Sequence, residues 1–381
     1  MKILLIGEYS RFHNSLKEGL VALGHEVVLV GSGDLFKKYP VDVDIGPKWV
    51  STTAIGRLVR KVVYKLSGFD LALWEAGYRF WNARKQFKGF DVVQLINSWS
   101  IRTTIAKEKK CIDFLATHNK QMVLSACGTD TAWVAYLLSD PLEYHLLTPY
   151  LNDKSLKKQY SSVLDYLTPK CQALYQYVVD RVSHIIPTDM DYYMGLKGQE
   201  KVTSLVPTPI NTSSLKVEFP QTTNPLVIFH GINRMNYLKK GNDIFEKALE
   251  LLQKKYPKKV KIITVESLPY TQYMKAYEQA HILLDQVYSY DQGYNALESM
   301  ARGKVVFTGA GTAFSKHYKL DVPVAVDAVP DARAIFLELE KLLHQPEVLA
   351  QISKHASRFV SQYHDHKKVA QTYVSIWQST P

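Results

Sequence analysis

Two continuous apolar runs near the N-terminus, separated by one amphipathic stretch, restrict the folds open to this chain. KILLI at 2–6 and EVVLV at 26–30 lack the polar alternation of a half-exposed strand, and such runs are typical of parallel strands buried on both faces. Between them Phe12, Leu16, Leu20 and Leu23 recur on one helical face, and Gly24 suits the end of a helix. The pattern predicts a strand, helix, strand unit in which residues 7–13 form the loop after the first strand. Loops in this position bind ligands in open α/β sheets.

The remaining sequence continues the α/β alternation in two parts. Short strands are expected at 91–96, 122–126, 184–187 and 202–206, with helices between them. The segment 207–225 is rich in Pro, Thr, Ser and Asn, has little periodicity and predicts a linker. A second α/β pattern starts with LVIFHG at Leu226, and its further strands are expected at 260–265, from 282 and from 305. Its helices are expected at 244–254, 294–302, 331–343, 346–363 and 367–377.

The chain length agrees with two domains, because 381 residues are enough to bury two apolar cores. We expect an N-terminal Rossmann-like domain at 1–206, the linker at 207–225 and a C-terminal Rossmann-like domain at 226–360. A C-terminal helix at 361–381 is expected to pack back on the N-terminal domain. The expected fold class is therefore α/β, with parallel sheets flanked by helices.

Charge and cysteine content narrow the classes of partner. Lysine and arginine outnumber aspartate and glutamate by 47 to 36, and the net charge of +11 favours nucleotide phosphates, nucleic acid or acidic lipid head groups. The cysteines Cys111, Cys127 and Cys171 have no CxxC spacing, which argues against a disulfide framework and against a thiolate metal site. No apolar run has the length of a membrane-spanning helix, and no signal peptide is visible. We expect a cytoplasmic protein.

The strongest local motif is SYDQGYNALESMARGKVVFTG at 289–309. Gly293 is placed in a turn, a helix is expected to open at Tyr294 or Asn295, and Glu298 lies about one turn inside that helix. A helix N-terminus offers backbone N–H groups to phosphate, and a nearby carboxylate can accept hydrogen bonds from ribose hydroxyls. These features suit a nucleotide diphosphate.

ALESMARGKVV closely resembles the C-terminal-domain signature of glycosyltransferase family 4 and related GT-B enzymes. The resemblance implies two Rossmann-like domains facing each other across a cleft, with the acceptor on the first and the nucleotide sugar on the second. The family has two glutamates with seven residues between them, and Glu298 matches the second, which binds ribose. The first, placed by the donor sugar, falls on Tyr290, and Asp291 is the adjacent carboxylate that could substitute for it. The preceding Asp285 and Gln286 also match an Asp-Gln pair of a GT-B branch.

A second motif, FHGINRMNYLKKGNDIF at 229–245, resembles the donor-phosphate loop of the same family. Its matching residues are Gly231, Arg234, Lys240 and Gly241, with Lys239 as an alternative to Lys240. Two cations near a helix start would neutralise charge that develops on a departing nucleotide diphosphate. A solvated charge run is the other interpretation. From this resemblance Arg234 and Lys240 are assigned catalytic as well as donor-binding roles.

In the first domain VLSACGTDT at 123–131 resembles the family's strand-end "HG-D" segment. Gly128 and Asp130 match, Asp130 is assigned a catalytic role, and Cys127 replaces the histidine of the family. Cys127 is interpreted as a small packing residue in preference to a nucleophile. The first loop is expected to present Gly7, Glu8, Arg11 and Asn14 to the cleft, while His13 is either a base or, more simply, a packing residue.

A basic amphipathic helix is expected at 53–68. Ile55, Leu58, Val59, Val62 and Leu66 alternate there with Arg57, Arg60, Lys61 and Lys65. One interpretation is peripheral docking on the anionic inner face of the cytoplasmic membrane, which would suit a lipid-linked acceptor. The other is an ordinary surface helix that packs its apolar face on the sheet.

Several classes of site lack their motifs. There is no HExxH, no Asp-x-Asp dyad, no cluster of His with Cys and no Walker loop, so we expect no metal and no cofactor. No nucleic-acid-binding motif accompanies the charge, so nucleic acid is not expected as a partner. The resemblance implies a retaining, metal-independent, hexosyltransferase-like enzyme that moves a sugar from a UDP- or GDP-linked donor to a glycan or lipid-linked acceptor in cell-surface polysaccharide or glycoconjugate synthesis. A GT-B-fold nucleotide-sugar epimerase and a catalytically silent nucleotide-sugar-binding protein are the alternatives.

Overall fold

The structure, a computed structural model, describes residues 1–34, 39–139, 142–220, 224–266 and 277–379. Its internal contacts divide the chain into two compact units. Unit 1 contains Met1–Tyr136, Ser162–Pro209 and His366–Pro381, and unit 2 contains Leu137–Ser161 and Ile210–Asp365. Within the described ranges no helix is both long and apolar enough to cross a membrane.

Unit 1 is built on a six-stranded parallel sheet with the strand order β3-β2-β1-β4-β5-β6. Its strands are β1 (Lys2–Ile6), β2 (Glu26–Gly31), β3 (Val43–Asp44), β4 (Val92–Leu95), β5 (Gln121–Ala126) and β6 (Ile185–Pro187). The central strand β1 pairs with β2 on one side and with β4 on the other, and Leu5 lies opposite both Leu29 and Gln94. Every strand of this sheet was predicted from the sequence except β3, the two-residue strand at its edge.

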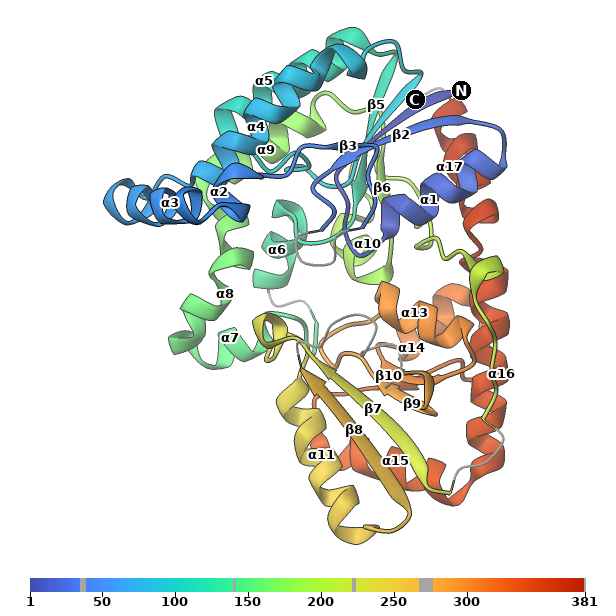
Figure 1. The fold of residues 1–381 in the computed structure, drawn as a ribbon. Coiled ribbons are helices and arrows are strands. Elements are labelled where there is room, and N and C mark those ends of the chain that lie inside the picture. Colours follow the sequence, from blue (N-terminus) through green and yellow to red (C-terminus); the bar gives the residue numbers. More distant parts are fainter. Residues whose placement is uncertain (35–38, 140–141, 221–223, 267–276, 380–381) are drawn as a thin grey trace. The chain divides into compact units, whose positions relative to one another are not determined.

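Helices cover both faces of this sheet, which explains the continuous apolar runs. Leu4 and Ile6 face α4 (Leu71–Ala83), α5 (Ile105–His118) and α9 (Pro169–Val179). Ile3 and Leu5 face α1 (Phe12–Ala22) and α17 (His366–Gln378) on the other side (Figure 1). Because successive side chains of a strand point to opposite faces, each residue of β1 after Lys2 must be apolar.

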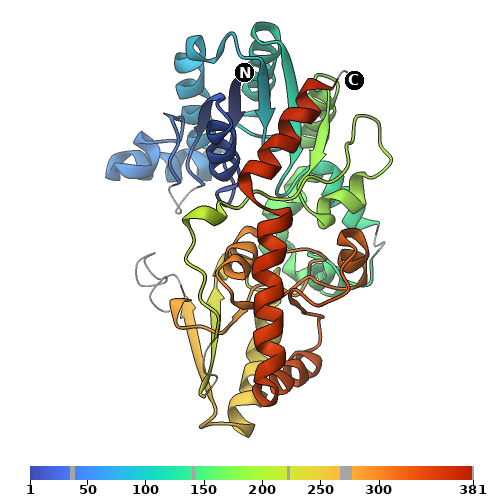
Figure 2. The ribbon, with the colours of Figure 1, turned by 90° about the vertical axis from the view of Figure 1, so that its right-hand side faces the viewer.

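The C-terminal helix α17 lies along α1, within unit 1 (Figures 1 and 2). The two helices approach closely at Gly19, where an added Cβ would lie 2.1 Å from the carbonyl oxygen of His366. Tyr373 and Trp377 are buried against α1 and the sheet. The side-chain amide of Gln121 on β5 also donates to the carbonyl oxygen of Trp377 (2.7 Å). The last helix of the chain therefore completes the core of the first unit.

The prediction of a strand at 202–206 is wrong. Only Val202 forms a bridge, to Ile185 of β6, although Thr203 donates its N–H to the carbonyl oxygen of Ile185 (3.0 Å). The next rung of a parallel ladder would need an N–H from residue 187, and Pro187 has none. The segment therefore runs beside β6 without continuing the sheet.

The shorter elements of unit 1 fill the connections between strands. They are α2 (Trp49–Thr52), α3 (Ala54–Ser67), η2 (Arg84–Phe87), η4 (Asp165–Leu167) and α10 (Met190–Leu196). Two more helices, α6 (Thr131–Leu138) and α8 (Lys157–Leu164), contain the points at which the chain leaves unit 1 and returns to it.

Unit 2 contains a five-stranded parallel sheet with the order β11-β10-β9-β7-β8. Its strands are β7 (Leu226–Ile232), β8 (Val260–Glu266), β9 (Ile282–Leu284), β10 (Val305–Thr308) and β11 (Val326–Asp327). One face is covered by α11 (Asn242–Lys255) and α15 (Ala332–His344). The other is covered by α13 (Tyr294–Ala301) and α14 (Thr312–Tyr318), while α16 (Pro346–Tyr363) contributes to both cores.

Two segments far from this sheet in sequence also belong to unit 2. The first, 137–161, includes α7 (Thr148–Asn152) and η3 (Lys154–Leu156), and its Tyr160 is fully buried with the Lys239 ammonium 5.7 Å from the ring centroid. The second is part of the predicted linker, with η5 at Thr212–Ser214, where Ile210 donates its N–H to the carbonyl oxygen of His364 (2.7 Å). Residues 221–223 of that linker lie outside the described residues.

Candidate functional site

The strand order of unit 2 indicates where a ligand should bind. Strand β8 lies on one side of β7, and the next strand in the sequence, β9, lies on the other side. The loops that follow the neighbouring strands β7 and β9 therefore lead away from each other. In open α/β sheets this topological switch point forms a ligand-binding crevice at the carboxyl ends of the strands. The loop after β7 contains Arg234 and Lys240, and the loop after β9 contains Tyr290, Asp291 and Gly293.

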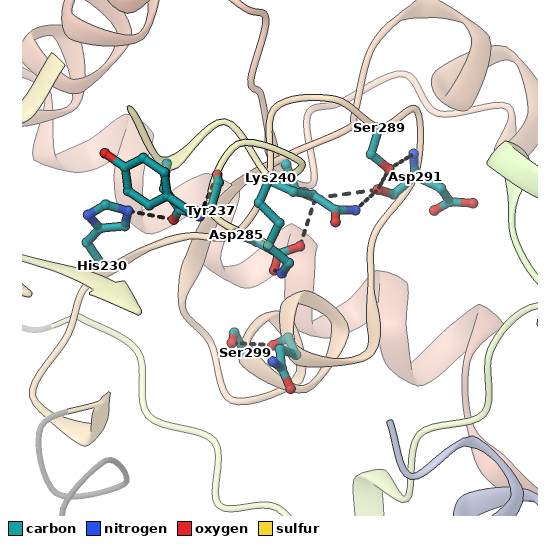
Figure 3. A network of polar contacts seen from close by, with 11 residues as sticks. His230, Tyr237, Lys240, Asp285, Ser289, Asp291 and Ser299 are labelled. Atoms are coloured by element: carbon teal, nitrogen blue, oxygen red, sulfur yellow. Dashed lines mark hydrogen bonds and ion pairs between the residues drawn. The ribbon is translucent and has the colours of Figure 1, made fainter. Parts of the chain in front are cut away.

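An ion pair joins these two loops across the switch point. The Lys240 ammonium donates to Oδ1 of Asp285 at 2.8 Å, as Figure 3 shows. The Asp285 side chain is only 4% exposed, while that of Lys240 is 30% exposed. A lysine ammonium has three N–H donors. The buried carboxylate of Asp285 therefore orients the Lys240 ammonium. The remaining N–H donors of Lys240 are available on its solvent-exposed side.

Gly241 positions Lys240 at the start of α11. Gly241 has a φ of 71°, and a Cβ there would lie 2.7 Å from Cβ of Val287, so neither the backbone conformation nor the space admits a larger residue. Val287 also donates its N–H to the carbonyl oxygen of Lys240 (2.9 Å). The loop after β9 thus holds both the backbone and the side chain of Lys240.

His230, on β7, has a structural part in the same loop. Its Nε2 lies 2.8 Å from Oδ1 of Asn242, and Nδ2 of Asn242 donates to the carbonyl oxygen of Tyr237 (3.1 Å; Figure 3). Burial lowers the pKa of His230, so the ring is neutral and Nε2 carries the donated proton. The contact fixes the segment between Tyr237 and Asn242.

Arg234, the other predicted phosphate-binding cation, is paired with a carboxylate. It begins η6 (Arg234–Asn236), its guanidinium donates to Oε2 of Glu266 at 2.7 Å, and both side chains are exposed. The guanidinium also lies 4.9 Å from the ring centroid of Tyr237. A phosphate that binds Arg234 must therefore compete with Glu266 at the end of β8.

Asp291 is turned toward the backbone of its own loop. Its side chain is buried, and Oδ1 accepts the N–H of Gln292 (2.7 Å). Its carbonyl oxygen accepts the hydroxyl of Ser289 (2.9 Å), which Figure 3 shows beside it. Asp291 thus shapes the loop after β9, and its role as a substitute for the missing glutamate stays a prediction.

Tyr290, which occupies the position of that glutamate, stacks on Tyr144. The ring centroids are 5.1 Å apart and the planes differ by 10°. Tyr144 comes from 137–161, the segment that joins unit 2 from the first half of the chain. No local sequence pattern predicts this contact, because the two tyrosines lie far apart in the chain.

Helix α13 begins at Tyr294, as the motif predicts. Its N-cap residue Gly293 provides no side-chain cap, and the Cβ position at Gly293 is 3.7 Å from Oδ2 of Asp285. Asn295 is exposed on the first turn. Glu298, the predicted ribose ligand, is partly exposed, and its Oε1 accepts a hydrogen bond from Arg302 (3.0 Å). The N-terminus of α13 therefore lies beside the lysine–aspartate pair.

Unit 1 has its own switch point, between β1 and β4. The loop after β1 begins with Gly7, at which a Cβ would lie 2.4 Å from Cγ2 of Ile96. Glu8 is buried, and its Oε2 accepts hydrogen bonds from the backbone N–H (2.8 Å) and the side-chain amide (2.6 Å) of Asn14. Burial raises the pKa of Glu8 to about 7. Glu8 thus caps the first turn of α1.

Arg11, the N-cap residue of α1, and His13, in its first turn, make their contacts within unit 1. Arg11, with a φ of 70°, donates to Oε1 of Glu18 on α1 (2.6 Å). His13 is fully buried, with Nδ1 2.7 Å from the carbonyl oxygen of Gly7 and Nε2 3.2 Å from Nε2 of Gln94. Burial lowers the pKa of His13 to about 4, so the ring is neutral and donates from Nδ1. His13 is a packing residue in this structure.

Asp130 is occupied by hydrogen bonds within unit 1. Ser98 donates its N–H to Oδ2 (2.7 Å) and its hydroxyl to Oδ1 (2.5 Å), and the N–H of Thr131 also reaches Oδ1 (2.8 Å). Burial raises the pKa of Asp130. These bonds tie the loop after β4 to the start of α6, so Asp130 has a clear positioning function here.

Gly128 and Cys127 follow β5. Gly128 has a φ of 79°, and its Cβ position is 3.3 Å from the ring of Tyr9 in the loop after β1. Burial raises the pKa of the Cys127 thiol well above its usual range, which keeps it protonated and supports its interpretation as a packing residue. The structure thus brings Gly7, Asn14, Gly128 and Asp130 to one edge of the first sheet.

Sequence reasoning missed the loop after β4. Nδ2 of Asn97 donates to the carbonyl oxygen of Thr129 (3.2 Å) and to the hydroxyl of Tyr166 (3.4 Å), which also accepts from Arg102 (2.8 Å). A signal was available, because Asn97 and Ser98 directly follow a predicted strand. Tyr166 had none, since its place depends on the return of the chain to unit 1.

Comparisons with known proteins agree with this architecture. Residues 235–375, less than half of the chain, match the family described as glycosyl transferase-like. No curated protein matches the chain in sequence.

Solved structures resemble the whole chain, and three of them illustrate the likeness. Sucrose-phosphate synthase from Thermosynechococcus elongatus is 13% identical, with a TM-score of 0.64 over 99% of this chain and 98% of that chain. Anabaena Alr3699/HepE in complex with UDP and glucose is 12% identical, with a TM-score of 0.59 over 100% of both chains. UDP-GlcNAc 2-epimerase from Neisseria meningitidis, bound to UDP-GlcNAc, is 13% identical, with a TM-score of 0.51 over 98% of this chain and 99% of that chain. The chain therefore has the GT-B fold, and its residues 235–375 are glycosyl transferase-like in sequence.

Proposed function

We propose that this protein transfers a sugar from a nucleotide-diphosphate donor to a glycan or lipid-linked acceptor. The observation that carries the proposal is the Lys240 ammonium, oriented by Asp285 at the switch point of unit 2 and next to the N-terminus of α13. A cation and a helix N-terminus at one point form a site for a dianionic diphosphate. Glu298, on the same helix, is proposed to accept hydrogen bonds from the ribose.

The proposed reaction breaks the bond between the anomeric carbon of the sugar and the terminal phosphate oxygen. The acceptor hydroxyl oxygen forms the new glycosidic bond, and its proton passes to an oxygen of the departing diphosphate. Lys240 and Arg234 offset the negative charge that grows on the leaving group, so the step is proposed to need no metal. Attack on the face from which the diphosphate departs would retain the anomeric configuration.

The family match supports the donor half of this proposal, since 235–375 includes Lys240, Asp285 and the whole of α13. The likeness to a structure that holds UDP and glucose favours a UDP-linked donor over a GDP-linked one. Synthesis of a cell-surface polysaccharide or glycoconjugate is the proposed setting for such a transfer.

Titration calorimetry with a panel of UDP- and GDP-linked sugars tests the proposal. Binding of at least one donor, followed by release of nucleoside diphosphate that depends on an added acceptor, is the expected result. Absence of binding by every member of the panel would overturn it.

A nucleotide-sugar epimerase is the second candidate, favoured by the likeness to a UDP-GlcNAc 2-epimerase. An epimerase would convert the bound donor to another sugar without any acceptor. Nuclear magnetic resonance of the donor incubated with the protein alone separates the two activities, because a transferase leaves the sugar configuration of the donor unchanged. A protein that binds donors and does neither would be the silent binding protein suggested by the replacements at Tyr290 and Cys127.

A further inference from the structure

Helix α3 has complete end caps but very little packing against the rest of unit 1. The hydroxyl of Thr53 accepts the N–H of Gly56 at the N-terminus (3.0 Å), and Gly68 has a φ of 69° at the C-terminus, where its N–H reaches the carbonyl oxygen of Tyr64 (2.8 Å). Gly56 is the only buried residue of the helix. A Cβ there would lie 2.2 Å from the carbonyl oxygen of Trp49, which shows that α3 touches α2 at this point. Figure 1 shows the rest of α3 extending away from the sheet of unit 1.

The apolar stripe of α3 faces away from the rest of unit 1. Ile55, Leu58, Val62 and Leu66 follow helical spacing and are 72%, 63%, 47% and 82% exposed. The residues turned toward the rest of unit 1 are Gly56 and the half-buried Val59 and Val63. Of the two interpretations of this helix, the one in which its apolar face packs on the sheet is therefore wrong for Ile55, Leu58, Val62 and Leu66. Leucine and isoleucine side chains that repeat along one exposed face are a mark of an interaction surface.

Positive charge borders this stripe. Residues 45–69 contain the five cations Lys48, Arg57, Arg60, Lys61 and Lys65 and no aspartate or glutamate. Lys61 and Lys65 follow Leu58 by three and seven residues, so they lie along one edge of the stripe. Among the described residues, neither of these two lysines has an ion-pair partner.

The two carboxylates that follow α3 most closely in the sequence, Asp70 and Glu75, are already engaged. Asp70 forms a two-point contact with Arg60, at 2.7 and 2.8 Å. Glu75 accepts backbone N–H groups from Lys48, Trp49 and Val50, at 2.9, 2.8 and 3.0 Å. The field around the stripe is therefore set by Arg57, Lys61 and Lys65.

A cationic groove adjoins the stripe. It has a volume of about 420 Å³ and is lined by Arg57, Arg60, Lys61 and Tyr64 of α3, together with Val50, Ser51 and Asp70. Its arginine and lysine donors suit the phosphate of a lipid head group.

Aromatic residues are exposed on the elements that contact α3. Trp49 on α2 and Trp74 and Tyr78 on α4 are all about half exposed, and the last two stack with ring centroids 5.7 Å apart. Tryptophan and tyrosine are enriched where proteins meet the polar boundary of a bilayer. An exposed apolar stripe with a basic border is the composition of a helix that lies in a membrane interface, and exposed aromatic rings on the neighbouring helices suit the same setting.

We propose that α3 docks this protein on an anionic lipid bilayer. Ile55, Leu58, Val62 and Leu66 enter the boundary between head groups and acyl chains, while Arg57, Lys61 and Lys65 contact lipid phosphates. A second copy of the chain is a poorer occupant, because packing stripe against stripe would bring the two rows of lysines together. This inference does not depend on the proposed sugar transfer, and its test needs no substrate.

Vesicle sedimentation with the full chain tests the apolar contribution. The wild type is expected to bind vesicles of phosphatidylglycerol and phosphatidylcholine and not vesicles of phosphatidylcholine alone, and to lose binding as salt is raised. The double variant Leu58→Ser/Leu66→Ser should bind at least about tenfold more weakly. The matched control Leu251→Ser/Leu337→Ser removes two exposed leucines of unit 2 and should bind as the wild type does.

A second pair of variants tests the charge contribution. Lys61→Gln/Lys65→Gln should reduce binding roughly tenfold or more, since each cation at an anionic surface is worth about fivefold. Lys254→Gln/Lys258→Gln, with the same net charge but changed in unit 2, should leave binding intact. Circular dichroism melts should agree among all variants, because every substituted residue is exposed.

Three results would overturn the proposal. One is absence of binding to anionic vesicles, and another is equal binding by the wild type and both α3 variants. The third is a dimer seen by sedimentation equilibrium without lipid that Leu58→Ser/Leu66→Ser abolishes, which would assign the stripe to a second copy of the chain.

Discussion

The Lys240 ammonium and the Asp285 carboxylate are 2.8 Å apart and come from loops that follow neighbouring strands, β7 and β9. Their exposures are unequal, since the aspartate is almost completely buried and the lysine reaches solvent. An unpaired buried carboxylate would lower the free energy of unfolding, so Asp285 favours the conformation that keeps Lys240 at the switch point. This asymmetry makes Lys240 the best-oriented cation of the candidate donor site.

Lys240→Met should lower the affinity for a nucleotide-diphosphate sugar by at least about tenfold, because a charged hydrogen bond contributes roughly 1.5–3 kcal/mol. The free energy of unfolding should also fall by about 1–3 kcal/mol, since Asp285 loses its partner. Calorimetry and urea unfolding measure the two effects. Lys239→Met is the matched control: Lys239 lies over the Tyr160 ring, so donor affinity should stay within about twofold while only stability changes. Loss of donor binding in Lys239→Met alone would contradict the assignment.

Removing Asp285 as well as Lys240 should cost less than the two single changes added together. The reason is that Lys240→Met in an Asp285→Asn background leaves no buried charge unpaired. A double-mutant cycle in the free energy of unfolding should give a coupling of about 0.5–3 kcal/mol. A coupling of zero would mean that the pair contributes nothing beyond its separate side chains.

Glu266→Gln should raise donor affinity up to about fivefold. In the structure Glu266 holds the Arg234 guanidinium at 2.7 Å, and an exposed pair of this kind contributes little to stability because water and salt screen it. Neutralising Glu266 removes the competitor for a diphosphate at Arg234. Calorimetry at low salt is the measurement, and the gain should be absent in an Arg234→Gln background. An unchanged or lower affinity would exclude Arg234 as a phosphate ligand.

Glu298→Gln should weaken nucleotide binding roughly tenfold if its carboxylate accepts hydrogen bonds from the ribose. Arg302→Gln is the control, because Arg302 donates to Oε1 of Glu298 at 3.0 Å and its removal breaks the pair while keeping the carboxylate. That control should bind donor as well as the wild type does. Comparison of a ribonucleotide with its 2′-deoxy form measures whether the lost contact is to the ribose. Equal losses in both variants would assign Glu298 to helix stability.

Glu8→Gln should stabilise the protein at alkaline pH relative to the wild type. Burial raises the pKa of Glu8 from 4.5 to about 7, so its favourable contribution is complete below pH 4.5 and is lost as the pH rises through 7. A shift of this size corresponds to a penalty on the order of 3 kcal/mol once the carboxyl is ionised. Urea unfolding of both proteins across this range should show a difference that grows with pH and then levels off. A difference independent of pH would contradict the raised pKa.

His13 has the opposite dependence. Burial lowers its pKa from 6.5 to about 4, so its contribution is complete above pH 6.5 and is lost as the pH falls through 4. His13→Gln should therefore have its acid-unfolding midpoint at a lower pH than the wild type. The glutamine amide keeps a hydrogen-bond donor for the carbonyl oxygen of Gly7. Acid titration followed by circular dichroism is the measurement. Equal acid midpoints would show that His13 is not the group that charges on unfolding.

Much of the candidate donor site could be placed from local sequence. The turn at Gly293, the start of α13 at Tyr294 and the loop at Arg234–Lys240 each follow a buried strand, and strand ends are where parallel sheets bind ligands. The predicted strand at 202–206 failed because Pro187, in the neighbouring strand, lacks the N–H for the next rung. The sequence of 202–206 itself contains no information on which residue of the neighbouring strand lies opposite it.

Local periodicity by itself determined the α/β class and most of the elements, because a strand buried on both faces must be apolar throughout, as β1 is. Tertiary structure decided which surfaces and side chains meet. It paired Asp285 with Lys240, stacked Tyr144 on Tyr290 and left the apolar stripe of α3 uncovered. The physical reason is that an amphipathic pattern fixes which face of an element avoids water, whereas the partner of that face depends on residues far away in the chain.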